Sequence, residues 1–205
     1  MIWSKESEIF LKILEKAIGE INCLAERIRS CVRCSFRKAC EQPLPGAGYP
    51  LADIMFVKGA PTKLEDSEGM AFFGNVGEAL YKAFGRLNMD ITDVYGTNAV
   101  KCFLPDVQSV SIEHIEACKE YLKTEIEILG PKVIVAMGPL AFAFLKTISL
   151  EEYKDSFSPG KVFKLRPDMQ VLLTHDPEQA LKNPQAKREF WQDLKKLRQI
   201  LGGVS

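Results

Sequence analysis

The hydrophobic run IMFVKG at residues 54–59 decides the fold of this chain. An apolar run of this length, bounded by glycine and proline, predicts a short buried strand that ends in a turn of Gly59, Ala60 and Pro61. Three further runs have the same character, at residues 94–100, 132–137 and 171–174. The chain therefore carries four candidate strands of a buried sheet.

Helical patterns lie before and between these strands. From residue 9 to residue 28, apolar side chains recur at steps of three and four, which is typical of one face of a long helix. Further helices are expected at residues 76–87, 111–129 with Ser111 as the cap, 139–147 and 184–201. Strands that alternate with helices predict an α/β fold whose parallel sheet is covered on both faces. Ligands of such sheets bind beyond the carboxyl ends of the strands, so we expect the site in the loops after Val57, Val100 and Thr174.

The composition is that of a folded globular protein. The 205 residues are 46% hydrophobic, which suits one domain with a helix at about residues 5–29 and a core at about 31–201. No stretch approaches the roughly 18 apolar residues of a membrane span, and the N-terminus is charged where a signal peptide would be apolar. We expect a cytoplasmic monomer. The 27 basic and 27 acidic residues give a net charge near zero, so the composition gives no support to a nucleic-acid partner. Any contact with DNA must come from a local patch of basic residues.

Four cysteines have the spacing of metal ligands. Cys31 and Cys34 form a Cys-x2-Cys pair directly after the first helix, and Cys102 and Cys118 accompany the second strand and the helix after it. Thiols of a cytosolic protein stay reduced, so metal ligation or burial are the two interpretations. Four thiolates suit zinc or an iron–sulfur cluster. Buried thiols remain the alternative for Cys102 and Cys118.

Two cysteines lie outside this set. Cys23 falls on the inner half of the first helix and is expected to be a core thiol. Cys40 lies six residues after Cys34, where it is either an exposed thiol or a substitute ligand.

Six motifs together resemble family 4 of the uracil-DNA glycosylase superfamily, over residues 31–196. They are CVRC (31–34), FVKGAPTKLEDSEGMAFFGNVG (56–77), YGTNAVKC (95–102), EAC (116–118), PKVIVAMGPLA (131–141) and THDPEQALKNPQAK (174–187). The resemblance implies a three-layer α/β/α fold around a four-stranded parallel sheet. It also implies a structural [4Fe–4S] cluster, whose ligand positions match Cys31, Cys34, Cys102 and Cys118.

The resemblance assigns base-binding roles to several residues. Such enzymes flip a nucleotide out of DNA and stack its base on an aromatic ring. Phe72 matches the stacking position, Asn98 matches the asparagine that hydrogen-bonds the uracil edge, and Ala60 and Pro61 keep part of the first motif. Without the resemblance, a core aromatic and a turn former would be the ordinary interpretations of Phe72 and Asn98.

Both catalytic motifs depart from the family. The family's Gly-Glu-Ala-Pro-Gly is replaced by Lys58-Gly59-Ala60-Pro61-Thr62, so that a carboxylate is absent at Gly59. Glu65 and Asp66 survive at the far end of the motif and could contribute a charge, although a solvated loop is the simpler interpretation of two adjacent acids. Asp176 stands where a catalytic histidine is expected, and an ionised aspartate would repel the departing base. His175 could replace that histidine only if the backbone shifts by one residue.

The expected DNA contacts lie in the last motif. Leu181 and Lys182 keep its apolar and basic character, and Lys187 and Arg188 complete a local basic cluster. Such a cluster is also typical of a solvated surface.

Three functions fit these features. The first is a glycosylase that removes uracil or another damaged base from single- or double-stranded DNA, with weak or altered activity. The second is a non-catalytic DNA- or base-binding protein of the same fold. The third is a zinc-stabilised α/β protein without a role on nucleic acids.

Overall fold

A six-stranded sheet forms the centre of the protein, in the order β1-β3-β2-β4-β6-β5. The computed structural model describes residues 5–106, 109–149 and 153–202. The strands are β1 (Ala47–Gly48), β2 (Ile54–Lys58), β3 (Val94–Asn98), β4 (Val133–Met137), β5 (Val162–Arg166) and β6 (Met169–Thr174). β3, β2, β4 and β6 pair in parallel and are the four expected strands, which confirms the α/β class.

The expected number of strands was too low, because an antiparallel strand extends each edge of the sheet. β1 lies in the proline- and glycine-rich segment before β2, and its two residues are too few to form a sequence pattern. Along β5 the exposed Val162 and Lys164 alternate with the buried Phe163 and Leu165. An edge strand of this kind has no continuous apolar run.

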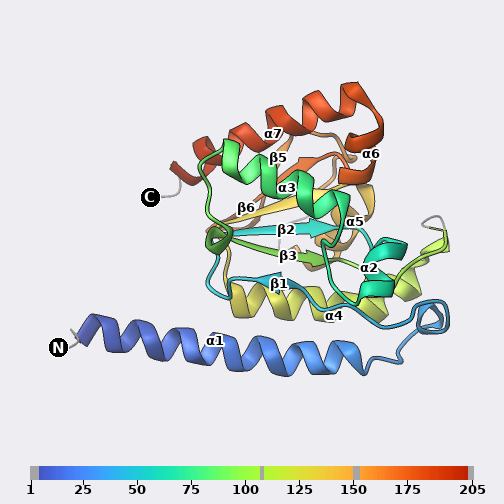
Figure 1. Ribbon diagram of the computed structural model, residues 1–205, viewed down its shortest axis with the longest axis horizontal. Coiled ribbons are helices and arrows are strands. Elements are labelled where there is room, and N and C mark those ends of the chain that lie inside the picture. The colour runs from blue at the N-terminus through green and yellow to red at the C-terminus, as the bar shows by residue number, and fades with distance from the viewer. Residues whose placement is uncertain (1–4, 107–108, 150–152, 203–205) are drawn as a thin grey trace.

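Helices cover both faces of the sheet (Figure 1). One face packs against α4 (Ile112–Leu129) and α5 (Pro139–Ile148), and α1 (Lys5–Arg29) lies outside α4. The other face packs against α3 (Asn75–Arg86) and α7 (Pro184–Gly202). Two short helices, α2 (Lys63–Glu68) and α6 (Pro177–Lys182), follow β2 and β6. The result is the expected three-layer arrangement.

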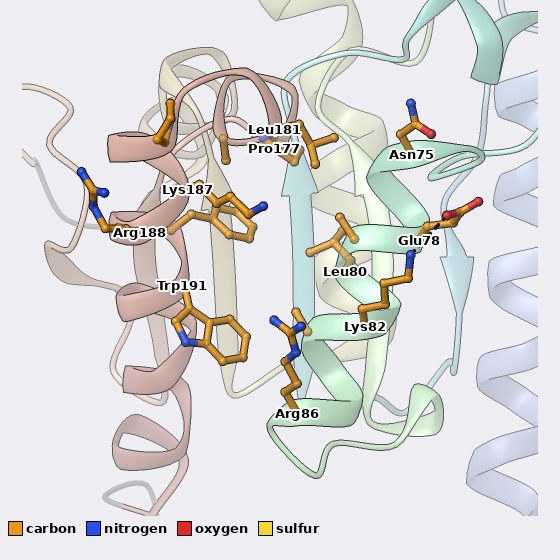
Figure 2. A pocket seen from close by; sticks show the side chains of 15 residues that line it. Asn75, Glu78, Leu80, Lys82, Arg86, Pro177, Leu181, Lys187, Arg188 and Trp191 are labelled. Atoms are coloured by element: carbon orange, nitrogen blue, oxygen red, sulfur yellow. Dashed lines mark ion pairs between the residues drawn. The ribbon is translucent and has the colours of Figure 1, made fainter.

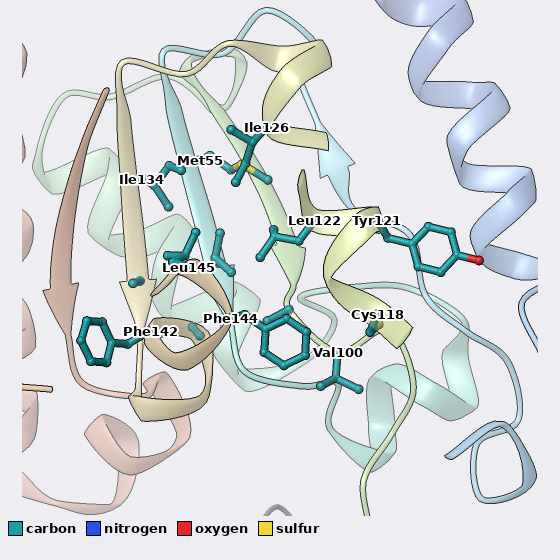
Figure 3. Packing of buried hydrophobic residues seen from close by; sticks show 14 of the residues in the cluster. Met55, Val100, Cys118, Tyr121, Leu122, Ile126, Ile134, Phe142, Phe144 and Leu145 are labelled. Carbon is teal, nitrogen blue, oxygen red and sulfur yellow. The ribbon is translucent and has the colours of Figure 1, made fainter. Parts of the chain in front are cut away.

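The larger hydrophobic cluster lies between the sheet and α4 and α5 (Figure 3). Met55 and Ile134 on the strands are fully buried against Leu122 and Ile126 of α4 and Phe144 of α5. This packing stabilises the sheet mainly by removing apolar surface from water. Among the described residues, no helix is both long and apolar enough to cross a membrane.

A buried ion pair also fixes α4 on the sheet. Lys101 Nζ lies 2.6 Å from Glu125 Oε2 and 2.7 Å from Thr97 Oγ1, and both charged side chains are at most 1% exposed. Removing one partner of such a pair leaves a buried charge and typically costs about 3–5 kcal/mol. The pair therefore fixes the position of Cys102 relative to the helix that carries Cys118.

Candidate active site

The carboxyl edge of the sheet carries a buried amide without a protein partner. Asn98 ends β3, its side chain is fully buried, and both Oδ1 and Nδ2 lack a hydrogen-bond partner among the described residues. Leaving a buried polar group unpaired costs about 1–3 kcal/mol, so such groups point to a ligand or to ordered water. Asn98 therefore has the properties of a side chain that recognises a bound molecule.

Phe72 is held next to this amide by its own backbone contacts. Its φ angle is 62°, in the left-handed region, and its N–H donates to Glu65 Oε1. The ring lies directly on Gly96, because a Cβ at residue 96 would approach Phe72 Cε2 to 2.7 Å. The Phe72 carbonyl lies against Gly77, where a Cβ would clash with the carbonyl oxygen. Because Gly96 and Asn98 are two residues apart on β3, their side-chain positions lie on the same face of the sheet.

A lysine that sequence reasoning did not single out lies beside this arrangement. Lys58 ends β2, is 1% exposed and pairs with the fully buried Glu65. Its Nζ lies 5.7 Å from the centroid of the Phe72 ring. The sequence signal for this lysine was its position, since a charged residue at the end of an otherwise apolar strand must find a partner if it is buried.

The acidic pair after the first motif is buried, so its interpretation as a solvated loop was wrong. Glu65 binds Lys58 and also accepts hydrogen bonds from the N–H groups of Thr62 and Phe72. Asp66 is 4% exposed, and both of its carboxylate oxygens lie 3.1 Å from the Glu41 N–H. The two carboxylates hold the Phe72 segment and the Cys40 segment in place.

Asp176 caps the N-terminus of α6 next to this site. Its Oδ1 accepts from the N–H groups of Glu178 at 2.9 Å and Gln179 at 3.3 Å, an arrangement typical of an N-cap. Burial raises the pKa of the Asp176 carboxyl, while these two N–H groups and the Lys58 charge oppose the rise. The Asp176 carboxyl therefore accepts protons at a higher pH than an ordinary aspartate.

His175 makes its contact on α7. Its Nε2 lies 2.6 Å from Glu189 Oε2, and this hydrogen bond is the main cause of the lowered pKa of Glu189. The side chain is 15% exposed. The structure thus gives each of the two neighbouring residues a distinct partner: a helix terminus for Asp176 and a carboxylate for His175.

The turn after β2 passes over the edge of the sheet. Gly59 leaves little room for a side chain, because a Cβ there would lie 3.1 Å from Leu140 Cβ. Ala60 packs against the cluster on the α4 and α5 face, and Pro61 is buried.

The cysteines with metal-ligand spacing lie together at one end of the larger cluster. Cys102 and Cys118 are buried, and the half-buried Cys31 and Cys34 pack against the same core. Burial raises the pKa of the Cys118 thiol to about 11 and also raises that of Cys102. Metal binding reverses such a shift, because a coordinated thiol is deprotonated outright.

Contacts between the turn at Cys34 and α4 keep the cysteine segments together. Ser35 Oγ lies 2.9 Å from His114 Nε2, and the rings of Phe36 and His114 stack with centroids 3.8 Å apart. His114 lies in the first turn of the helix that carries Cys118. Within residues 5–106, 109–149 and 153–202, no three cysteine, histidine or acidic side chains surround a position for one metal ion.

The two remaining cysteines correct one expectation and exclude one of the two alternatives for the other. Cys23 is exposed, so its assignment as a core thiol was wrong. Cys40 is only 6% exposed, and its side chain contacts that of Cys102. It is therefore not an exposed thiol, and it lies next to the expected ligands.

A groove lies beside the site, between α3 on one side and α6 and α7 on the other (Figure 2). Its volume is about 780 Å³. The expected DNA contacts Leu181, Lys187 and Arg188 are exposed and line it, whereas the exposed Lys182 does not.

Comparisons with known proteins agree with this architecture. The chain is 32% identical to a type-4 uracil-DNA glycosylase of Archaeoglobus fulgidus, over 87% of this chain and 92% of that protein. It is 33% identical to a type-4 uracil-DNA glycosylase of Sulfurisphaera tokodaii, over 86% and 83% of the two chains. A type-4 uracil-DNA glycosylase of Thermotoga maritima is 28% identical, over 87% and 93%. Residues 45–195 match the family described as the uracil DNA glycosylase superfamily. Since this match covers most of the chain, the protein belongs to the uracil-DNA glycosylase superfamily.

Proposed function

We propose that this protein is a DNA-repair glycosylase that hydrolyses the bond between uracil and deoxyribose. The buried, unpaired amide of Asn98 beside the Phe72 ring carries the proposal. The amide can donate to a uracil carbonyl and accept from the neighbouring ring N–H, which satisfies both of its free atoms. The ring offers a stacking surface for a flipped base.

The charges of the site fit the departure of a base as an anion. As the bond breaks, negative charge develops on uracil and positive charge on the sugar. We assign stabilisation of the uracil anion to Lys58, whose ammonium lies next to the Phe72 ring where the base would stack. Asp176 opposes this effect when ionised, whereas its protonated form is neutral and can donate a hydrogen bond.

Base entry requires local movement, because Asn98 is fully buried and Lys58 is 1% exposed. The Lys58 ammonium is paired with Glu65 and lies 5.7 Å from the centroid of the Phe72 ring, so we expect it to exchange part of this pairing for a base that stacks there. Glu65 keeps two backbone donors, the N–H groups of Thr62 and Phe72, during such a change.

Cys31, Cys34, Cys102 and Cys118 would hold a [4Fe–4S] cluster. When bound, the cluster would cross-link the segment after α1, the end of β3 and α4, which is a structural role. The thiolates of a cubane bind different irons and stand farther apart than the ligands of one zinc ion.

Anaerobic incubation with single- and double-stranded oligonucleotides that carry uracil or hypoxanthine, followed by alkaline cleavage, tests the function. We expect cleavage at uracil that is lost in Phe72→Ala and Asn98→Ala. Specific binding of uracil DNA without cleavage at any pH would instead identify a non-catalytic base-binding protein, which the changes at Gly59 and Asp176 would explain.

A further inference from the structure

The groove between α3 and α7 begins at the carboxyl edge of the sheet, where Asn75 lies three residues after Phe72 and Pro177 directly follows Asp176, and it continues along the side of the molecule (Figure 2). Asn75, Pro177 and Leu181 line it at the carboxyl edge of the sheet. Arg86 and Trp191 line it at the other end. A chain that leaves the active site at this edge can therefore continue into the groove.

The groove has an excess of positive charge that the whole protein lacks. Lys82, Arg86, Lys187 and Arg188 line it, against the single carboxylate of Glu78. Glu78 Oε2 lies 3.5 Å from Lys82 Nζ, so it offsets only one of these charges. A phosphate backbone is the complementary ligand for such a surface.

Trp191 adds an aromatic surface between two cations. Its ring is half-buried and has Arg86 Cζ at 5.8 Å and Lys195 Nζ at 5.5 Å from its centroid. An aromatic ring in a positively charged groove is typical of sites for single-stranded nucleic acid, because each base can stack on it without sequence preference. Paired bases of a duplex are already stacked and cannot reach such a ring.

We propose that this groove binds the single DNA strand that continues from the flipped nucleotide, with Trp191 as its stacking platform. This inference rests on the proposed function and adds the strand preference and the path of the substrate. It extends the DNA-binding surface from α6 and α7 to Lys82 and Arg86 on α3. Binding of single strands does not require that a base be excised, so the two proposals can fail separately.

A single-tryptophan variant tests the groove directly. The chain has two tryptophans, so Trp3→Phe leaves Trp191 as the sole tryptophan reporter. We expect a uracil-free oligothymidylate of 12 nucleotides to quench its fluorescence, and a duplex of equal length to quench it much less. Arg86→Ala with Lys187→Ala should weaken binding and flatten the log–log salt dependence by about 0.7 for each lost phosphate contact. Trp191→Ala, measured by fluorescence anisotropy of labelled DNA, should weaken binding about tenfold or more.

The matched control removes two lysines from α1, on the opposite side of the sheet. Lys12→Ala with Lys16→Ala changes the net charge by the same amount and should leave the affinity and the salt slope unchanged. Equal quenching by duplex and single strand, or an unchanged salt slope in the groove variant, would overturn the inference. Quenching without base excision from any substrate would refute the proposed function and leave the groove assignment standing.

Discussion

Lys58 and Asn98 are register partners at the carboxyl ends of the parallel strands β2 and β3. Side chains of paired residues leave a sheet on the same face, so Lys58 and the unpaired amide of Asn98 project from neighbouring positions on that face. The family motif has glycine at the position of Lys58 and therefore no side chain there. This chain has lost the acid expected at Gly59 and has gained a cation one residue earlier.

Replacing Lys58 by an uncharged side chain should slow base excision. Lys58→Met alone would leave the Glu65 charge buried without its partner, and Glu65→Gln alone would do the same to the Lys58 charge, so the two changes are combined and the double variant is compared with the wild type. We expect the single-turnover rate to fall about 10²-fold in the double variant, the usual effect of losing one group that stabilises developing charge. Quenched-flow or manual sampling of uracil release measures the difference.

A faster double variant would contradict this role. It would mean that Lys58 blocks the position of the base and that the family's glycine is the more active residue. Circular dichroism at 222 nm during heating separates either result from a loss of folding.

The position of the Phe72 ring should depend on Gly96. A Cβ at residue 96 would lie 2.7 Å from the ring, so Gly96→Ala should displace the ring and weaken binding of a uracil-containing strand. Gly85→Ala in α3 is the matched control, because nothing lies within 4 Å of a Cβ there. The control should stabilise the helix by about 0.5–1 kcal/mol and leave binding unchanged. Equal affinities of the two variants would argue against a stacking role of Phe72.

The parallel strands and long helices could be predicted because their apolar patterns are local. The apolar pattern of residues 9–28 also predicted the helix α1 correctly. It did not show which of these apolar side chains are buried. Phe10 and Ile13 are about half exposed, and Cys23 is exposed with them. α2 and α6 are six residues long, which is too short for a helical period to be recognised.

Sequence reasoning proposed those candidate site residues that stand in a recognisable motif. It did not propose the residues whose place in the site depends on contacts formed by folding. Phe72 and Asn98 became candidates through resemblance to a family. The burial of Lys58 and Glu65 depends on two segments seven residues apart that fold back on each other, and each residue alone has the composition of a surface side chain. Charged residues are rarely fully buried unless they are paired, and pairing is a property of the fold.

Loss of a cluster ligand should remove the iron. Cys118→Ser is expected to lose the absorbance near 400 nm of anaerobically purified protein and to unfold at lower temperature, because the segments that the cluster joins would be released. Cys40→Ser is the control from the same cluster of thiols and should retain iron. Iron retained in Cys118→Ser but lost in Cys40→Ser would make Cys40 the fourth ligand.

The charge of Asp176 should limit excision near neutral pH. Burial raises the pKa of its carboxyl, so the neutral form becomes populated at a higher pH than in an ordinary aspartate. Excision that needs the neutral form must speed up as the pH falls toward that pKa and slow down as the pH rises above it. Asp176→Asn removes the charge and keeps an oxygen for the N–H groups of Glu178 and Gln179, since asparagine caps helices as well as aspartate does.

We therefore expect Asp176→Asn to excise uracil faster than the wild type at pH 7.5, with a rate that no longer rises at lower pH. Single-turnover rates between pH 5 and 8 measure both effects. Gly59→Glu should add to the gain only together with Leu140→Ala, because Leu140 fills the space that a side chain at residue 59 needs. A wild-type rate that is independent of pH and survives Asp176→Asn unchanged would show that the Asp176 carboxyl does not face the base. Loss of activity in His175→Ala would then assign the donor to His175, which would have to leave Glu189 to reach the base.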